Sequence, residues 1–193
     1  MGKACGSLQA GAGAGKGRNG GHRKLSLAVL LYDMESCKDG SPNNLQIKSF
    51  TTVREKNGIA YYNGDFLIAK LLKSISKLEI RTTQCNDAVS FNTCSYLNTL
   101  SFSTAVCPLM VSEMMPWSSI VRAVRPSFRC PFDAGEYTLK NATINMAALE
   151  KMAGSSLPEV LGKIYLPVLR LFDETKQLYG CVKFKASFIN TRG

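Results

Sequence analysis

Histidine is nearly missing from this chain. Its 193 residues include a single histidine, His22, which lies in the basic amino-terminal stretch. Ser-His-Asp and Cys-His catalysis require an imidazole that moves a proton near neutral pH, so these mechanisms are excluded. Carboxylate pairs such as Asp173 with Glu174, or Asp133 with Glu136, fall inside turn signals where acidic side chains are simply solvated. We therefore expect no enzymatic activity and no cofactor.

The cysteines lack the spacing of a metal site. No Cys-x-x-Cys pair occurs, and with one histidine the zinc patterns that combine cysteine and histidine are absent. Cys5 lies in the amino-terminal stretch, and an even number of cysteines remains in the rest of the chain: Cys37, Cys85, Cys94, Cys107, Cys130 and Cys181. The interpretation that we favour is three disulfides formed in an oxidising compartment. The alternative is six buried free thiols, since cysteine is among the most buried residue types.

Long apolar runs are also missing. No stretch reaches the ~18 continuous apolar residues that a membrane-spanning helix needs. The best candidate, "LSLAVLL" at 25–31, follows basic residues but is not followed by a small-residue cleavage site. We interpret it as a first strand. The export signal that the cysteines lead us to expect is therefore not evident in the first residues as written.

Acidic residues are absent from the first 24 positions, which carry five of the basic residues behind the net charge of +10. This Gly/Ala-rich stretch cannot bury enough apolar surface to offset chain ordering, so we predict a disordered tail over 1–24. Its "GAGAGKGRN" resembles a phosphate-binding loop, but Ala10 and Gly17 occupy positions that require glycine and a hydroxyl. The tail lacks interleaved aromatic residues, and we expect no nucleic-acid partner. Residues 25–193 are predicted to form one domain.

The rest of the chain is dominated by strand patterns. The last predicted strand shows the clearest alternation, with Val182 and Phe184 on one face and Lys183 and Lys185 on the other. Alternating or β-branched stretches between turn signals predict strands at 27–34, 45–53, 60–70, 75–83, 135–145, 162–172 and 178–188. The five residues "DETKQ" predict a hairpin connection between the last two. Together these strands predict an all-β, antiparallel two-sheet sandwich of immunoglobulin-like type.

One segment breaks the strand pattern. Residues 112–124, "SEMMPWSSIVRAV", predict a short helix or loop that is too apolar for an ordinary surface connection. One interpretation is that its apolar side chains cap the core of the sandwich. The other is a mobile apolar lid, because methionine and tryptophan adapt to irregular ligands and to lipid interfaces.

Two carboxy-terminal motifs resemble a known family. "CPFDAGEYTLKN" at 130–141, followed by "LRLFDETKQLYGCVKFKASF" at 169–188, is similar to the ganglioside activator-like proteins of the ML (MD-2-related lipid-recognition) superfamily, and to its arthropod-type members. The earlier "MESCKD" and "QCNDAVSFNTC" also fit, so the resemblance covers roughly residues 33–189. It implies a β-cup with an apolar cavity between the sheets and a short helical or loop lid. It also implies a secreted or lysosomal protein that binds a lipid and lifts it from membranes.

The same resemblance implies how the cysteines pair. It suggests Cys37 with Cys181 and Cys85 with Cys94, which leaves Cys107 with Cys130. Such a third bond anchors the start of the 135–145 strand to the far end of the loop that carries the lid. The family pattern has two further cysteines crossing this loop, and this sequence lacks both.

The predicted site consists of apolar side chains and contains no catalytic residue. The predicted cavity-facing residues are Ile47, Leu78, Ile80, Ile144, Leu166, Val182, Phe184 and Phe188, with Met114, Met115, Trp117 and Ile120 at the rim. Alternation identifies a face and not a void, so each of these residues is equally compatible with plain core. Basic residues that are candidates for contact with acidic head groups are Lys183, Lys185, Arg122, Arg125 and Arg129, although a solvated basic face is the commoner explanation. Asn141 begins an Asn-Ala-Thr glycosylation triplet.

Three functional hypotheses follow. The first is a non-enzymatic protein that takes up a lipid, glycolipid or other apolar ligand for transport, presentation or extraction from membranes. Its partners would include a membrane surface and a lipid-processing enzyme or receptor. The second is an extracellular chemosensory or recognition module that acts through a protein partner and has a filled core. The third, a hydrolase, requires two carboxylates that converge in one pocket.

Overall fold

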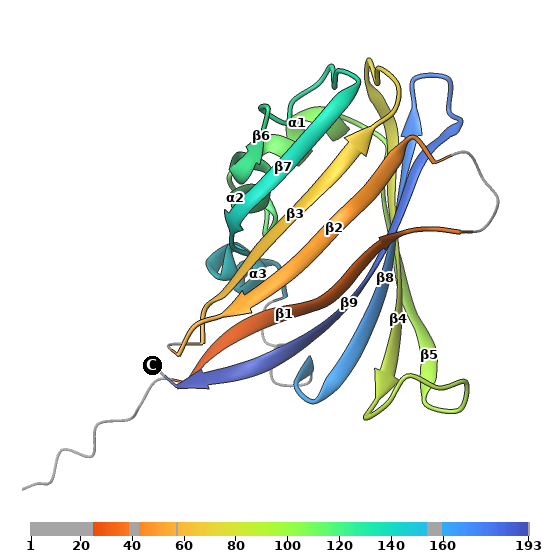
Figure 1. The fold of residues 1–193 in the computed structure, drawn as a ribbon. Helices are drawn as coiled ribbons and strands as arrows, with labels where there is room; N and C mark the ends of the chain where they lie inside the picture. Colours follow the sequence, from red (N-terminus) through yellow and green to blue (C-terminus); the bar gives the residue numbers. More distant parts are fainter. Residues whose placement is uncertain (1–24, 39–42, 57, 154–159, 193) are drawn as a thin grey trace, which may run out of the picture.

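The computed structural model describes residues 25–38, 43–56, 58–153 and 160–192 (Figure 1). The predicted tail at 1–24, with Cys5, His22 and the glycine-rich stretch, lies outside the described residues. Within them the chain forms mainly antiparallel strands in two sheets, with three short helices. The predicted all-β, two-sheet architecture is confirmed.

The larger sheet has five strands in the order β1-β9-β8-β4-β5, and every neighbouring pair is antiparallel. Its strands are β1 (Leu25–Ser36), β9 (Leu178–Arg192), β8 (Lys163–Asp173), β4 (Ile75–Asn86) and β5 (Cys94–Phe102). The smaller sheet has the order β2-β3-β7-β6. Its strands are β2 (Leu45–Arg54), β3 (Ala60–Ile68), β7 (Gly135–Ala142) and β6 (Val124–Arg125). Strands β5 and β6 were not predicted from the sequence.

The core lies between the inner faces of the two sheets. In the larger sheet Leu78 of β4 is paired with Leu171 of β8, and both side chains are buried. In the smaller sheet Tyr62 and Tyr137 point inward and are almost completely buried. Alternation therefore works as expected for a half-buried sheet, with apolar residues inside and polar residues outside. The predicted alternation of β9 has this form, with Val182 and Ala186 buried and the lysines between them less buried.

The two sheets are joined where β1 passes β2. The Ser36 hydroxyl oxygen accepts a hydrogen bond from the Ile47 N–H at 2.8 Å. The Tyr62 hydroxyl of the smaller sheet donates to the Val29 carbonyl of the larger sheet at 2.6 Å, and the Thr52 hydroxyl donates to the Leu31 carbonyl. These bonds close one side of the sandwich with polar groups that are satisfied across the layers.

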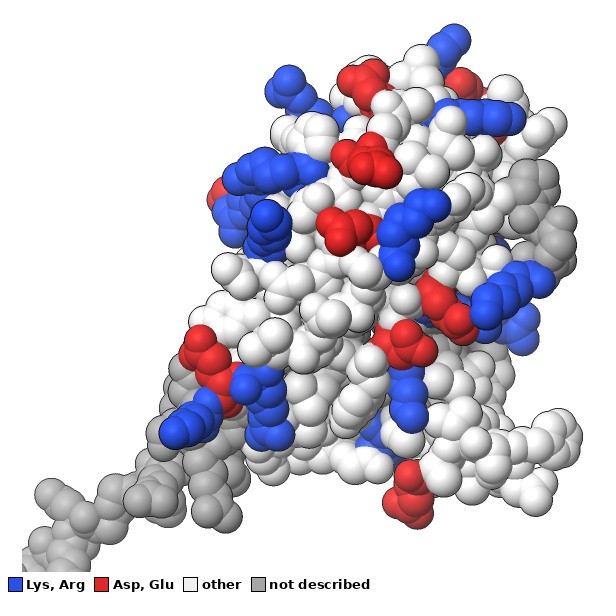
Figure 2. All heavy atoms as spheres, in the orientation of Figure 1, with Lys and Arg blue, Asp and Glu red and all other residues white. Residues whose placement is uncertain are grey.

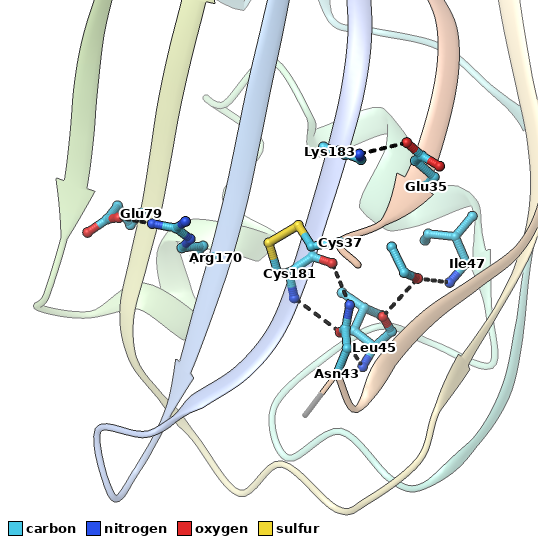
Figure 3. The surroundings of a disulfide bond; sticks show 10 residues. Glu35, Cys37, Asn43, Leu45, Ile47, Glu79, Arg170, Cys181 and Lys183 are labelled. Carbon is cyan, nitrogen blue, oxygen red and sulfur yellow. Dashed lines mark hydrogen bonds and ion pairs between the residues drawn. A yellow bond between two sulfur atoms is a disulfide. The ribbon is translucent and has the colours of Figure 1, made fainter. Parts of the chain in front are cut away.

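A disulfide corner reinforces this closed side (Figure 3). Cys37 at the end of β1 is bonded to Cys181 of β9. The Asn43 amide donates to the Cys181 carbonyl at 2.7 Å, and its oxygen accepts from the Cys181 and Leu45 N–H groups. A Cβ added to Gly180 would lie 2.7 Å from the Leu45 Cβ, so the start of β2 approaches β9 too closely for a larger residue.

Helices cover part of the smaller sheet near β7 and β6 (Figure 1). They are α1 (Val106–Val111), α2 (Ser118–Ala123) and α3 (Met146–Ala153). The segment predicted as a helix or loop at 112–124 contains α2 and ends in the unpredicted β6. Cys107 in α1 is bonded to Cys130, and Cys85 is bonded to Cys94 across the β4–β5 hairpin. The three disulfides of the structure thus join the pairs that the family resemblance implied.

Candidate ligand cavity

An apolar cavity of about 190 Å³ lies between the two sheets. Both sheets and the segment from α2 through β6 contribute to its wall. The lining residues are Met34, Leu45, Ile47, Ser49, Phe50, Gly64, Asp65, Phe66, Ile120, Val121, Val124, Phe128, Leu139, Leu169, Val182 and Phe184. The lining is almost entirely apolar, so an apolar guest is favoured. An apolar cavity of about 150 Å³ accepts benzene in an engineered protein.

Aromatic rings form one wall of the cavity. Phe66 of β3 stacks on Tyr137 of β7 at 5.4 Å between ring centroids, and Phe128 meets Phe66 edge-on at 5.9 Å. Phe128 also packs against Phe132 at 4.3 Å. On the β2 side Phe50 stacks on Tyr62 at 6.1 Å. Rings in these arrangements support one another, so they define a wall that keeps its shape.

The α1–α2 cover lies over this wall and is held by polar contacts. The Trp117 indole N–H donates to the Met110 carbonyl at 3.1 Å, which ties the start of α2 to α1. Arg122 forms an ion pair with Glu113 at 2.8 Å on the exposed side of the cover. The Asn145 N–H donates to the Pro116 carbonyl at 2.8 Å. The Asn145 bond therefore attaches the cover to its surroundings between Cys107 and Cys130, while the other two contacts join parts of the cover to each other.

Three polar side chains of the smaller sheet bond one another on its exposed outer face, behind the cavity wall. Asp65 accepts hydrogen bonds from the Ser49 and Thr138 hydroxyls at 2.8 and 3.0 Å. Asp65 is the only carboxylate among the lining residues, so the wall of the cavity offers no pair of acids. Because the carboxylate of Asp65 is bonded on the exposed face, the interior is left to apolar contacts.

The predicted cavity residues fall into three groups. Ile47, Ile120, Val182 and Phe184 line the cavity. Leu78 is buried, and Ile80, Ile144 and Phe188 pack against the core without lining the cavity. Leu166, Met114, Met115 and Trp117 belong neither to the lining nor to the core cluster.

Leu166 lies on the outer face of β8, contrary to the expected inward orientation. Side chains alternate along β8, so Leu166 points to the same side as Arg170, four residues on. The Arg170 guanidinium bonds Glu79 on the outside of the sheet. Tyr165 and Leu169 point to the opposite side and face inward. Apolar residues occur on both faces of β8, so alternation did not distinguish them. Met114 also differs from its expected place at the rim, because 69% of its surface is exposed at the tip of the cover.

Several lining residues were not predicted. Phe66 and Leu169 both lie in predicted strands. The inward parity of Phe66 was available from the alternation of β3, whereas β8, apolar on both faces, gave no such signal for Leu169. Phe128 lies in an irregular segment between Pro126 and Cys130, where no periodicity marks an inward side chain. Its only signal was an aromatic residue in a segment closed by a cysteine and two prolines.

The acidic pairs considered for hydrolysis lie at turns. Asp173 accepts from the Thr175 hydroxyl at 2.6 Å and from the N–H groups of Thr175 and Gln177. These bonds, the Thr175 hydroxyl first, hold the pKa of Asp173 below its ordinary value. The Asp133 carbonyl accepts from the Tyr137 hydroxyl, so this segment also closes on itself. The arrangement of Asp173 stabilises the β8–β9 turn and keeps the carboxylate ionised.

The basic residues proposed for head-group contact mostly have partners within the chain. Lys183 bonds Glu35 at 2.9 Å, and the Lys185 ammonium lies 5.7 Å from the centre of the Tyr32 ring. The Arg125 guanidinium donates to the Arg122 and Val124 carbonyls. These contacts favour the solvated-face explanation. Lys and Arg are also interspersed with acidic residues on the face shown in Figure 2.

Asn141 of the glycosylation triplet is exposed at the end of β7. Its backbone φ is 50°, and its N–H donates to the Asn63 side chain at 2.9 Å.

Among the described residues, no helix has the length and apolar character needed to cross a bilayer. Nor does that part of the chain bring three or more metal-ligating side chains together.

Comparison with known proteins finds a weak structural similarity and no match by sequence. No protein-family model matches the sequence, and no curated protein matches it. Among solved structures, chicken MD-1 in complex with lipid IVa is similar at a TM-score of 0.29 and 14% sequence identity. That alignment covers 80% of this chain and 96% of the MD-1 chain. A TM-score of this size does not establish a shared fold, so the strand order and registers above define the architecture.

Proposed function

We propose that this protein is a non-enzymatic lipid-binding protein that takes up a lipid, glycolipid or other apolar ligand between its sheets. The observation that carries the proposal is the apolar cavity beneath α2 and Phe128. Burial of a lipid chain gains about 0.8 kcal/mol for each methylene removed from water, which requires no covalent chemistry. The resemblance of the two carboxy-terminal motifs to the ML superfamily supports the same ligand class. It also supports secretion or a lysosomal location.

The size of the cavity limits how a ligand enters. Its volume of about 190 Å³ lies below the roughly 300–1,000 Å³ of typical ligand pockets. A whole lipid chain would therefore enlarge the hollow by displacing part of its wall. The α1–α2 cover is the element to move, because polar contacts and one disulfide hold it, whereas both sheets are bonded along β1 and β2.

A recognition module that acts through a protein partner remains the alternative. That hypothesis expects a filled core, and the hollow between the sheets therefore favours the ligand-binding protein over it. A carboxylate hydrolase expects two converging acids, and the cavity wall carries only Asp65. Transport, presentation and membrane extraction are uses of the same bound state, and a receptor or lipid-processing enzyme would be the recipient.

The test is titration of the purified, non-reduced protein with a single-chain fatty acid, followed by native mass spectrometry. Wild-type protein is expected to carry one ligand. Ile47→Phe adds volume inside the cavity and should lower the bound fraction at least about tenfold. Leu166→Phe is the matched control, because the same ring is added on the outer face of β8 and should leave binding unchanged.

Trp117 provides a second readout. It lies in the cover and not in the cavity wall, so its fluorescence should change when the cover moves to admit a ligand. Fatty acid, glycolipid and liposomes would be compared. If none of them binds or alters the fluorescence, or if Ile47→Phe binds as well as the wild type, the proposal is wrong.

A further inference from the structure

The longest uncharged segment of the chain lies at one edge of the fold. Between Asp87 and Glu113 the sequence contains no charged residue, although 20% of the chain is charged. This segment contains the end of the β4–β5 hairpin turn, β5 and α1. We call residues 88–111 the uncharged edge. In Figure 2 the lower right of the molecule, where the β4–β5 hairpin lies, is largely free of blue.

Apolar side chains are exposed along this edge. Phe91 in the hairpin turn is 97% exposed, and Tyr96, Leu97 and Leu100 of β5 are each about half exposed. β5 is the last strand of its sheet, and β4 is its single partner strand among the described residues. The outer side of β5 therefore presents backbone N–H and C=O groups beside apolar side chains. This combination is a template for pairing with another strand.

The other edge strands are protected and β5 is not. Natural sheet edges are usually blunted by charged side chains or proline. β1 carries Asp33 and Glu35, β2 carries Lys48 and Arg54, and β6 carries Arg125. The sequence of β5, "CSYLNTLSF", contains neither a charge nor a proline. Of the four edge strands in the described part of the chain, β5 is thus the one open to pairing.

We propose that β5 pairs antiparallel with β5 of a second copy of this chain, which joins the two five-stranded sheets into one. A chain with a net charge of +10 repels its copies, and an uncharged surface is where two copies approach at least cost. A two-fold axis makes the contact self-complementary. It brings the Cys94 end of each β5 beside the Phe102 end of the other, and neither strand carries a charge.

A lipid surface fits this edge less well. It supplies no regular hydrogen-bond partners for an exposed strand, and the uncharged edge has no Lys or Arg to attract anionic head groups. The proposed dimer is independent of any ligand in the cavity. The cavity wall contains no residue of β5 or of the turn before it.

The test is sedimentation velocity of the full, oxidised chain over increasing protein concentration. Wild-type protein is expected to shift from monomer to dimer. Asn98→Lys and Ser101→Lys each place a charge on exposed positions of β5 and should raise the dimer dissociation constant at least about tenfold. Val53→Lys is the matched control, because it adds the same charge at an exposed apolar position of β2 and should leave the constant unchanged.

Circular dichroism verifies that the variants are folded, and two positions in β5 keep a folding defect in one variant from deciding the result. Hydrogen exchange of the β5 amides should slow at the concentrations where the dimer forms. The proposal is overturned if the wild type stays monomeric at every concentration, or if both β5 variants dimerise like the wild type. A wild-type monomer that binds zwitterionic phosphatidylcholine vesicles, with that binding lost in Asn98→Lys, would overturn the dimer and assign the edge to a membrane instead.

Discussion

The Trp117 indole N–H donates a hydrogen bond to the Met110 carbonyl at 3.1 Å, and this bond joins the two helices that cover the cavity. Trp117, which was expected at the rim of the cavity, is thus tied to the helix that precedes it. The Cys107–Cys130 disulfide joins the two ends of the cover, and the Trp117 bond adds a second link inside it. Movement of α2 away from α1 then requires that the Trp117 bond be broken.

Trp117→Phe should loosen the cover. The change removes the donor and leaves the Met110 carbonyl without it, which should lower the free energy of unfolding by about 1 kcal/mol. Urea unfolding followed by circular dichroism measures this loss. Trypsin should also cleave faster after Arg122, which lies in α2 of the cover. Met114→Ala is the control, because its exposed side chain should change stability by less than about 0.5 kcal/mol. Equal stability and cleavage in both variants would show that the bond does not hold the cover.

The three disulfides should contribute unequally to stability. Cys37–Cys181 closes 144 residues, Cys107–Cys130 closes 23 and Cys85–Cys94 closes 9. In the chain-entropy model the longest loop contributes about 5 kcal/mol and the two shorter ones about 3 kcal/mol each. Paired Cys→Ser variants compared by urea unfolding should therefore rank the Cys37–Cys181 pair as the costliest to remove. A smaller loss for that pair than for Cys85–Cys94 would contradict the ranking.

A cavity residue can be predicted from the sequence where one face of its strand is polar and the other apolar. β9 has lysines on one face and Val182 with Phe184 on the other, and both apolar residues line the cavity. β8 is apolar on both faces, and Leu166 was placed on the wrong one. β5 was missed because Leu97 and Asn98 interrupt its alternation and serine and threonine fill most of the other positions. Nearly all of its residues are exposed, so neither face required a continuous apolar pattern.

Contacts between distant segments lie beyond sequence periodicity. Phe128 reaches Phe66 from an irregular segment, and only the folded arrangement shows that their rings meet. The bond from Tyr62 to the Val29 carbonyl joins different sheets, and nothing in either strand's pattern indicates it. The disulfide pairs were available through family resemblance and not from spacing, because six cysteines allow many connectivities.

Glu79 should make stability depend on acidic pH. Its carboxylate bonds Lys77 at 2.6 Å and Arg170 at 3.5 Å, and these cations, Lys77 first, lower the pKa of Glu79 below 4.5. A lowered pKa in the folded state means that the stabilisation is present above pH 4.5 and is lost as the pH falls through the lowered value. Glu79→Gln should therefore cost about 1 kcal/mol at neutral pH and flatten the loss of stability in acid. Urea unfolding over a pH series measures both effects, with the exposed Glu136→Gln as control. Parallel acid limbs in the wild type and Glu79→Gln would contradict the assignment.

Tyr62 should make stability depend on alkaline pH. Burial is the main cause that raises the pKa of Tyr62 from 10.0 to about 12, and its hydroxyl donates to the Val29 carbonyl across the sheets. Because the folded state holds the proton more tightly, this stabilisation is complete below pH 10 and is lost as the pH rises through about 12. Tyr62→Phe removes the titrating group and leaves the Val29 carbonyl without its donor, so it should cost about 1–3 kcal/mol at neutral pH.

The decisive comparison is the slope of the free energy of unfolding against pH between pH 10 and about 12. In this interval Tyr62 keeps its proton in the folded state and loses it in the unfolded state. In the wild type the free energy of unfolding should fall more steeply there than in Tyr62→Phe, and the two should converge at the alkaline end. Tyr96→Phe is the matched control, because it removes an exposed hydroxyl from β5 and should retain the wild-type slope. If Tyr62→Phe retains that slope too, the hydroxyl does not hold its proton by burial between the sheets, and the β1–β2 side is not closed by this bond.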